Sequence, residues 1–143
     1  MSTSRRCEIY IDGASHGNPG PAGVGVVLMD GPGDGPATPR RQFSKYIGEA
    51  TNNVAEYLAL VYALQEAIRE GYTELTVKTD SELLARQLNG RYRVRDRQLR
   101  LFYDLSAYLM EGFRVCRIHH IPRTQNVLAD RLAGQAVKNA DKR

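Results

Sequence analysis

The hydrophobic pattern changes its period along the chain, and the order of the two periods restricts the fold more than any other feature. Residues 7–12 (CEIYID) alternate apolar and polar side chains, and residues 23–30 (GVGVVLMD) and 40–47 (RRQFSKYI) also have the pattern of short strands. From about residue 53 to residue 70 the spacing becomes helical, with apolar side chains at Val54, Leu58 and Val61. Gly71 fits a C-cap for that helix.

The second half of the chain alternates strands and helices. Residues 74–80 (ELTVKTD) and 113–121 (FRVCRIHHI) read as strands, and residues 81–88, 99–112 and 126–140 read as helices. The complete order predicts an α/β fold with a mixed five-stranded sheet flanked by helices. Its first three strands would be antiparallel, and the last two would run parallel to the first. Residues 31–39 (GPGDGPATP) predict an exposed hairpin loop.

Length and composition predict one globular domain over residues 1–143, with a basic tail from about residue 139. The chain is 42% apolar and 25% charged, which excludes a disordered protein. No apolar run reaches the ~20 residues of a membrane helix, so we expect no membrane partner. The N-terminus lacks the apolar region of a signal peptide, and Cys7 and Cys116 are far apart in strand-like runs. These features predict reduced thiols and a cytoplasmic protein.

The charge distribution makes nucleic acid a candidate partner. The net charge is +4, with sixteen arginines against four lysines. The arginine fork suits phosphate groups, although a solvated basic surface explains composition equally well. Six arginines lie between residues 86 and 100 around Tyr92, where they could follow a phosphate backbone or simply form a solvated loop. The glycine-rich segments 13–20 and 31–36 match neither a P-loop nor a dinucleotide fingerprint, so no small-molecule cofactor is expected.

Four carboxylates lie at junctions between the predicted elements. Asp12 and Asp80 end two strands that would be parallel neighbours, which would place both at one edge of the sheet. Glu56 and Asp130 lie early in two helices. Each has a local alternative: Asp12 as a turn residue, Glu56 in a capping box with Asn53, Asp80 as an N-cap, and Asp130 as a first-turn acid.

The local alternatives do not explain why all four acids sit beside apolar or small residues. Clustered carboxylates raise one another's pKa unless cations are present. Hard oxygen ligands suit Mg²⁺ or Mn²⁺, and no His/Cys pattern indicates zinc. Two such ions ~4 Å apart can hold the attacking water and the leaving oxygen of a phosphodiester.

Four motifs resemble the type 1 ribonuclease H family in order and spacing: DGASHGNPGPAG, TNNVAEYLAL, TDSELLARQLNG and NVLADRLA. The resemblance extends from Cys7 to about Lys138. It implies that the family's four catalytic, metal-binding acids are Asp12, Glu56, Asp80 and Asp130. The metal would be Mg²⁺, with Mn²⁺ as a substitute and two ions per site when substrate is bound. The substrate contacts implied by the resemblance are Asn18, Thr51, Asn52 and Asn53, with Thr51 and Asn53 lining a DNA-phosphate pocket.

The implied activity is endonucleolytic cleavage of the RNA strand of an RNA–DNA hybrid by a monomer, leaving 3′-hydroxyl and 5′-phosphate ends. Some family members carry an extra basic helix that grips the hybrid, and this chain is expected to lack it. Two alternatives stay open. One is a nuclease of the same fold with another substrate, such as a junction resolvase or transposase core. The other is a catalytically inert hybrid-binding module.

The segment HHIPRTQN (residues 119–126) leaves one catalytic role undecided. Many family members place a mobile histidine ten residues before the fourth acid, which is the position of His120. The following PRTQNVLAD resembles a subgroup in which an arginine near this site serves instead, here Arg123. Spacing favours His120 as the residue that assists turnover, with Arg123 as a substrate contact and His119 as a structural residue.

Overall fold

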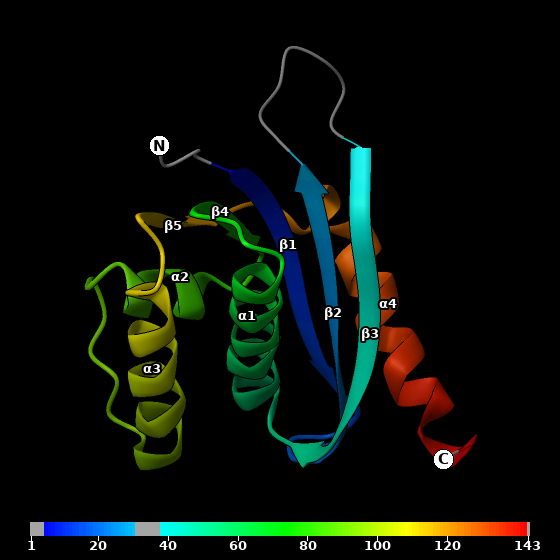
Figure 1. Cartoon of the computed structure of the whole chain (residues 1–143). Helices are drawn as coiled ribbons and strands as arrows, with labels where there is room; N and C mark the ends of the chain where they lie inside the picture. Colours follow the sequence, from blue (N-terminus) through cyan, green and yellow to red (C-terminus); the bar gives the residue numbers. More distant parts are fainter. Residues whose placement is uncertain (1–4, 31–37, 143) are drawn as a thin grey trace.

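The computed structural model describes residues 5–30 and 38–142, which form a sheet with helices on both faces (Figure 1). The strands are β1 (Arg6–Ser15), β2 (Gly20–Asp30), β3 (Thr38–Ala50), β4 (Glu74–Thr79) and β5 (Val115–His120). The helices are α1 (Asn52–Arg69), α2 (Glu82–Leu88), α3 (Arg97–Met110) and α4 (Val127–Lys138), with 3₁₀ turns η1 (Arg123–Gln125) and η2 (Asn139–Lys142). The element order agrees with the order predicted from the sequence.

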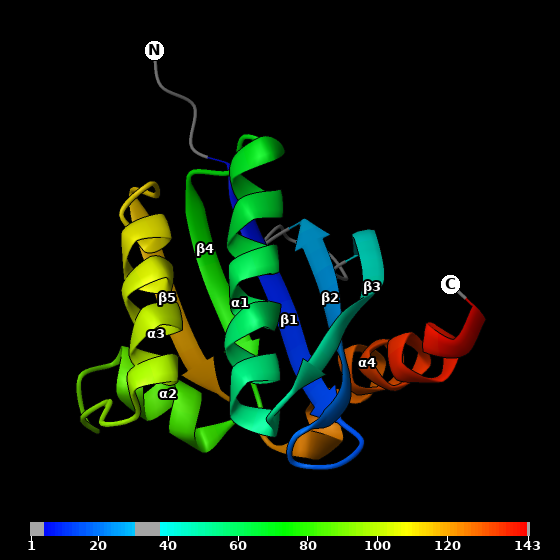
Figure 2. The same cartoon turned by 90° about the horizontal axis from the view of Figure 1, so that it is seen from below.

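The sheet has the strand order β3-β2-β1-β4-β5 (Figure 2). Strands β1, β2 and β3 pair antiparallel, whereas β4 pairs parallel to both β1 and β5. The predicted mixed sheet is therefore confirmed. Several boundaries were predicted wrongly: β2 begins at Gly20 rather than residue 23, and β3 covers Thr38–Ala50 rather than residues 40–47. The difference that matters for the site is that β1 continues to Ser15, because Gly13–Ser15 pair with Ala22–Val24, so Asp12 lies inside the strand. The hairpin loop expected at residues 31–39 lies mostly outside the described residues.

The main core lies between the sheet and α1. Ile9, Ile11 and Val77 from the strands pack with Leu60 and Leu64 from the helix, and all five are fully buried. Helices α1, α2 and α3 cover one face of the sheet, and α4 covers β1 and β2 on the other face (Figures 1 and 2). Among residues 5–30 and 38–142, no helix combines the length and apolarity needed to span a membrane.

Glycines on β2 let α4 approach the sheet closely. A Cβ on Gly25 would lie 2.2 Å from the carbonyl oxygen of Ala129, and one on Gly23 would lie 2.5 Å from the Cβ of Ala136. Since real Cβ atoms do not come that close, only glycine permits this helix–strand distance. The contact fixes the first turn of α4, including Asp130, against the sheet.

Hydroxyl groups cap the helices that follow β3 and β4. The Thr51 side chain accepts a hydrogen bond from the Val54 N–H at 3.2 Å, and Ser81 accepts one from Leu84 at 3.2 Å. The capping-box alternative for Glu56 and the N-cap alternative for Asp80 are therefore wrong, because other residues occupy both caps. Asp130 does lie in the first turn of its helix.

Candidate active site

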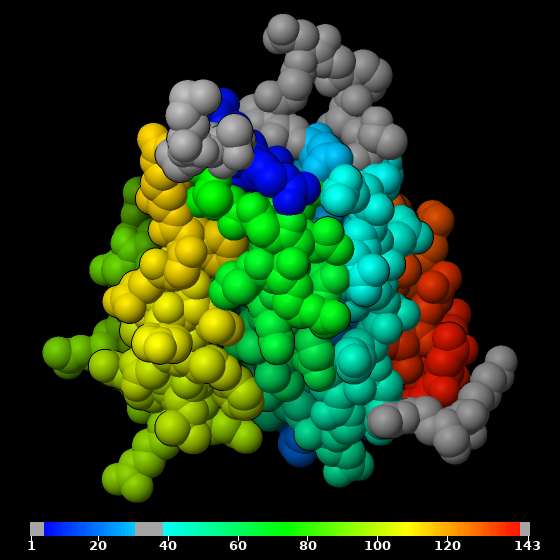
Figure 3. All heavy atoms as spheres, viewed as in Figure 1, coloured from blue at the N-terminus to red at the C-terminus, as the bar shows by residue number. Residues whose placement is uncertain are grey.

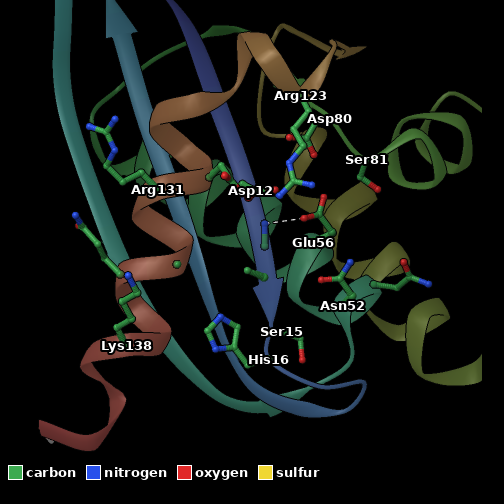
Figure 4. A pocket seen from close by; sticks show the side chains of 16 residues that line it. Asp12, Ser15, His16, Asn52, Glu56, Asp80, Ser81, Arg123, Arg131 and Lys138 are labelled. Carbon is green, nitrogen blue, oxygen red and sulfur yellow. Dashed lines mark hydrogen bonds and ion pairs between the residues drawn. The ribbon is translucent and has the colours of Figure 1, made fainter.

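Three of the four predicted acids meet at one edge of the sheet. The parallel pairing of β1 with β4 ends at Ile11 and Thr79, so Asp12, in β1, and Asp80, directly after β4, follow the last paired residues of two adjacent strands. Glu56 reaches the same point from α1, and carboxylate oxygens of the three acids lie within 4.8 Å of one another (Figure 4). Three segments separated in sequence thus build one acidic cluster.

Glu56 is held in place by the β1 backbone. The Gly13 N–H donates to Glu56 Oε1 at 2.7 Å, and a Cβ on Gly13 would lie 2.3 Å from the carbonyl carbon of Ala55. A glycine is required here because the first turns of α1 lie almost on the strand. Glu56 is only 6% exposed, and its second oxygen, Oε2, is buried with no hydrogen-bond partner among the described residues. A buried carboxylate oxygen without a partner needs a cation or a proton.

The cluster is electrostatically strained without a cation. Burial, followed by the charges of Glu56 and Asp80, raises the pKa of Asp12 to about 10. Burial also raises the pKa of Glu56 to about 7, although the hydrogen bond from Gly13 opposes the rise. Both acids would be ionised at neutral pH only if positive charge compensated them. An all-oxygen set with an unpartnered oxygen fits a hard divalent cation such as Mg²⁺ or Mn²⁺.

Asp130 lies beside this cluster at the rim. It lines the same groove, and its side chain is 42% exposed. Arg123, from η1, places Nη2 at 3.6 Å from Asp130 Oδ1. The fourth acid is therefore more exposed to solvent than Asp12 or Glu56, and it has an arginine as a partner.

Asn126 connects the elements of the site, and sequence reasoning did not assign it a role. Its side-chain amide donates to the Ile11 carbonyl at 2.8 Å and to Asp80 Oδ2 at 3.2 Å, and the residue is 1% exposed. The side chain thereby ties the start of α4 to β1 and orients the Asp80 carboxylate. Both bonds join residues far apart in sequence, so no local pattern could have identified them.

The acids open into a polar groove of about 730 Å³. Asn52 and Asn53 line it, and the Asn18 side chain accepts a hydrogen bond from the Asn52 N–H at 2.9 Å. The hydroxyl of Thr51 caps α1. Figure 4 shows side chains that line the groove, including Asn52. The predicted substrate contacts thus gather at the N-terminus of α1, close to the acids.

The groove also contains residues that sequence reasoning missed: His16, Ser81, Arg131, Gln135 and Lys138. For Lys138 the sequence did contain a signal. It follows Asp130 and Gly134 at intervals of four residues, so a helix places all three on one face. His16, in the β1–β2 connection, had none, because its position depends on where two strands turn.

The structure separates the two candidates for assisting turnover. Arg123 lines the acidic groove, whereas His120 is exposed and lines a second hollow of about 520 Å³ with His119, Lys78 and Arg86. The structure thus places only Arg123 in the lining of the acidic groove, and which of the two residues assists turnover stays a prediction.

The basic segment between α2 and α3 is largely open to solvent. Arg86 pairs with Glu82 at 2.7 Å and stacks on Tyr92, and Arg100 pairs with Asp104 at 3.2 Å. The other four arginines of this stretch are exposed: Arg91, Arg93, Arg95 and Arg97. Residues 89–96 contain no helix, in line with the expected lack of an extra basic helix.

A five-stranded mixed sheet with carboxylates within β1, directly after β4 and on α1 defines a domain of the ribonuclease H-like class. A family model described as "Reverse transcriptase-like" matches residues 10–136. Ribonuclease HI of Halobacterium salinarum is 42% identical over 94% of this chain and 66% of its own length. The bifunctional protein Rv2228c of Mycobacterium tuberculosis is 40% identical, but this chain spans only 35% of it. The chain belongs to the type 1 ribonuclease H family.

Solved structures agree with this assignment. The RNase H1 of Halobacterium salinarum superposes with a TM-score of 0.88, covering 94% of this chain and 99% of that one. The N-terminal RNase H domain of Rv2228c gives a TM-score of 0.90 at 39% identity, covering 97% and 98% of the two chains. LC11-RNase H1, solved in complex with an RNA/DNA hybrid, gives 0.86 at 40% identity over 94% and 98%.

Proposed function

We propose that this chain is an endoribonuclease that cleaves the RNA strand of RNA–DNA hybrids. The observation that carries the proposal is the meeting of Asp12, Glu56 and Asp80 within 4.8 Å, with an unpartnered Glu56 oxygen, in a polar groove. A related protein at 40% identity has been solved with such a hybrid, which supports the same substrate class here.

In this proposal the four acids hold two Mg²⁺ ions, or Mn²⁺ as a substitute, when substrate is bound. Bound divalent ions would supply Lewis acidity to the phosphodiester and lower the pKa of the attacking water. Asn126 keeps the Asp80 carboxylate oriented, and the Gly13 N–H does the same for Glu56. Arg123 would stabilise the negative charge that develops on the phosphate, since its guanidinium stays protonated; its position 3.6 Å from Asp130 supports this role.

Strand selectivity would come from the N-terminus of α1. Asn18, Asn52 and Asn53 present amide groups that can hydrogen-bond 2′-hydroxyls and base edges in a wide minor groove. Thr51 and Asn53 would face the phosphates of the DNA strand. That the protein acts as a monomer is part of the proposal. A cytoplasmic location is part of the proposal, supported by the free thiols of Cys7 and Cys116.

A substrate panel tests the proposal against its alternatives. Labelled RNA–DNA hybrid, duplex DNA, duplex RNA and a four-way junction are incubated with the protein, with and without Mg²⁺. We expect cutting of the RNA strand of the hybrid only, and only with the metal. Preferential cutting of junctions or duplex DNA would indicate another nuclease of this fold, and binding without cutting would indicate an inert module.

We expect Arg123 to contribute more to turnover than His120. Arg123→Ala should lower kcat by about 10-fold to 100-fold, since it removes a fixed charge beside Asp130. His120→Ala should leave kcat within about 3-fold, because His120 lines the second hollow. Single-turnover rates on one hybrid decide between them, with His119→Ala as the matched control. A larger loss for His120→Ala, with a changed acidic limb of the pH–rate profile, would restore the histidine to the catalytic role.

The exposed Arg93 and Arg95, before α3, and Arg97, its first residue, are expected to bind phosphates. Replacing Arg93, Arg95 and Arg97 by Gln should raise KM and flatten its salt dependence, with little change in kcat. Each lost contact lowers the log–log slope by about 0.9 for duplex DNA, so three contacts would lower it by roughly 2.7. Measuring KM over a salt series checks this, and an unchanged slope would assign these arginines to a solvated surface.

A further inference from the structure

The groove continues past the acids along one face of α4. The residues of this helix that line the groove are Asp130, Arg131, Gly134, Gln135 and Lys138. With 3.6 residues per turn these positions share one side of the helix, opposite the side that packs on the sheet. In Figure 4 Arg131 and Lys138 extend the lining away from Glu56 and Asp80. Figure 3 shows α4, in orange and red, at the margin of the molecule beside β3, where a ligand can reach it.

Gly134, in the middle of this face, has no structural need to be a glycine. It is an interior residue of α4, where glycine is among the least favourable residues, and its φ is not positive. A Cβ on Gly134 would meet nothing within 4 Å among the described residues, whereas Gly23 and Gly25 are needed for the contact of α4 with β2. Glycine also serves where a ligand must come close to the backbone. An open helical glycine in the wall of the groove fits that use.

Two basic side chains flank this glycine. Arg131 lies about one turn before Gly134 and Lys138 one turn after it, and both are exposed. No carboxylate among the described side chains forms an ion pair with either of them, whereas Arg86 and Arg100 each pair with an acid of their own helix segment. Unpaired cations on both sides of an open stretch of helix favour a ligand with several phosphate groups in a row.

We propose that the RNA strand of the hybrid continues from the acids along this face of α4, with its sugar–phosphate backbone against Gly134 and its phosphates at Arg131 and Lys138. The inference rests on the proposed function and extends it to the nucleotides beside the cleaved bond. Asp130 and Lys138 are about 12 Å apart along the helix, the axial length of about three phosphates of one duplex strand. The strand on α4 is the RNA, because this wall belongs to the groove that contains the acids.

Substitution of Gly134 tests the close approach. Gly134→Leu should raise KM for a hybrid by about 5-fold to 100-fold, with kcat within about 3-fold, because extra methylenes would have to fit into a tight contact. Gly134→Ala should raise KM less and should raise Tm by about 2–5 °C, since it removes a glycine from a helix interior. Weaker binding by a more stable protein excludes misfolding as the cause. Val127→Leu, at a 54% exposed residue of the same helix outside the groove lining, is the matched control and should keep the native KM.

Charge removal tests the phosphate contacts. Arg131→Gln/Lys138→Gln should raise KM and lower the log–log salt slope by roughly 1.8, because each lost phosphate contact removes about 0.9 for duplex DNA. Arg69→Gln/Arg117→Gln removes the same net charge from exposed positions outside the groove lining. This control should leave the slope unchanged.

Shortened hybrids test which strand lies on α4. Removing RNA nucleotides on one side of the cleavage site should abolish the difference in KM between the native chain and Gly134→Leu, whereas shortening the DNA strand over the same positions should preserve it. A native KM for Gly134→Leu, an unchanged salt slope for the double variant, or a difference that depends on the DNA strand would overturn the inference. In each of these cases the native chain still cuts the hybrid. A native chain that cuts no hybrid would overturn the proposed function as well.

Discussion

Glu56→Gln should abolish Mg²⁺-dependent cleavage, with a loss of about 10³-fold or more in kcat. A neutral amide is a poor ligand for a hard cation, and loss of one ligand removes several kcal/mol of transition-state stabilisation. The fold should survive, because the amide oxygen can accept the same hydrogen bond from Gly13 that Glu56 Oε1 accepts at 2.7 Å. Single-turnover cleavage of a labelled hybrid at saturating Mg²⁺ measures the effect.

The same helix supplies a matched control. Glu66 is also buried, at 8% exposure, but it pairs with Arg41 at 2.6 Å and Arg69 at 3.7 Å, away from the groove. Glu66→Gln should keep native turnover. At about pH 8 without metal, the two substitutions should change the free energy of unfolding in opposite directions. Glu56→Gln should raise it by about 1–3 kcal/mol relative to the native chain, and Glu66→Gln should lower it because its ion pairs are lost. Near-native turnover in Glu56→Gln would remove Glu56 from the metal site.

Without divalent metal, the free energy of unfolding should fall as the pH rises from about 5 to about 9. Folding raises the pKa of Glu56 from 4.5 to about 7 and that of Asp12 from 3.8 to about 10. Between the unfolded and folded values the folded state binds more protons than the unfolded state, so stability decreases with pH. For Glu56 alone the difference corresponds to about 3 kcal/mol.

Denaturant unfolding in EDTA across this pH range measures the slope, and adding Mg²⁺ should restore stability at the alkaline end. Metal binding reduces the repulsion between the clustered carboxylates. Because the metal binds the folded state, it also shifts the folding equilibrium toward that state. Glu56→Gln should flatten the pH dependence, while Glu66→Gln should leave the slope unchanged. A native chain whose stability is level from about pH 5 to about pH 9 in EDTA, with no response to Mg²⁺, would show that the acids are not electrostatically coupled.

Much of the fold followed from local patterns. The alternation at residues 7–12 and the helical spacing from residue 53 to residue 70 predicted the right element types. The patterns are informative because the apolar side chains of a strand or helix must lie on the face that packs against the core. The boundaries were less accurate where glycine and proline suggested a turn. Residues 13–15 look like a loop in sequence, yet they extend β1, because pairing with β2 outweighs local turn preference.

The sequence by itself determined which residue types could bind a hard cation and which segments carry them. Asp12, Glu56 and Asp80 were identifiable because acids beside apolar residues at element junctions are costly unless they are used. Their meeting within 4.8 Å was decided by tertiary structure, through the Ile11–Thr79 end of the parallel pairing and the close approach of α1 at Gly13.

Only the tertiary structure showed that Arg123 lines the acidic groove while His120 lines a second hollow, and only it revealed the contacts of Asn126. The ten-residue separation from Asp130 along the chain favoured His120. The path after β5 turns through η1, which carries Arg123 to Asp130, while His120 stays at the strand end beside the second hollow. The Asn126 amide meets Ile11 and Asp80 only because α4 is seated on the glycines of β2. Hydrogen bonds between distant segments depend on packing, which local sequence patterns do not encode.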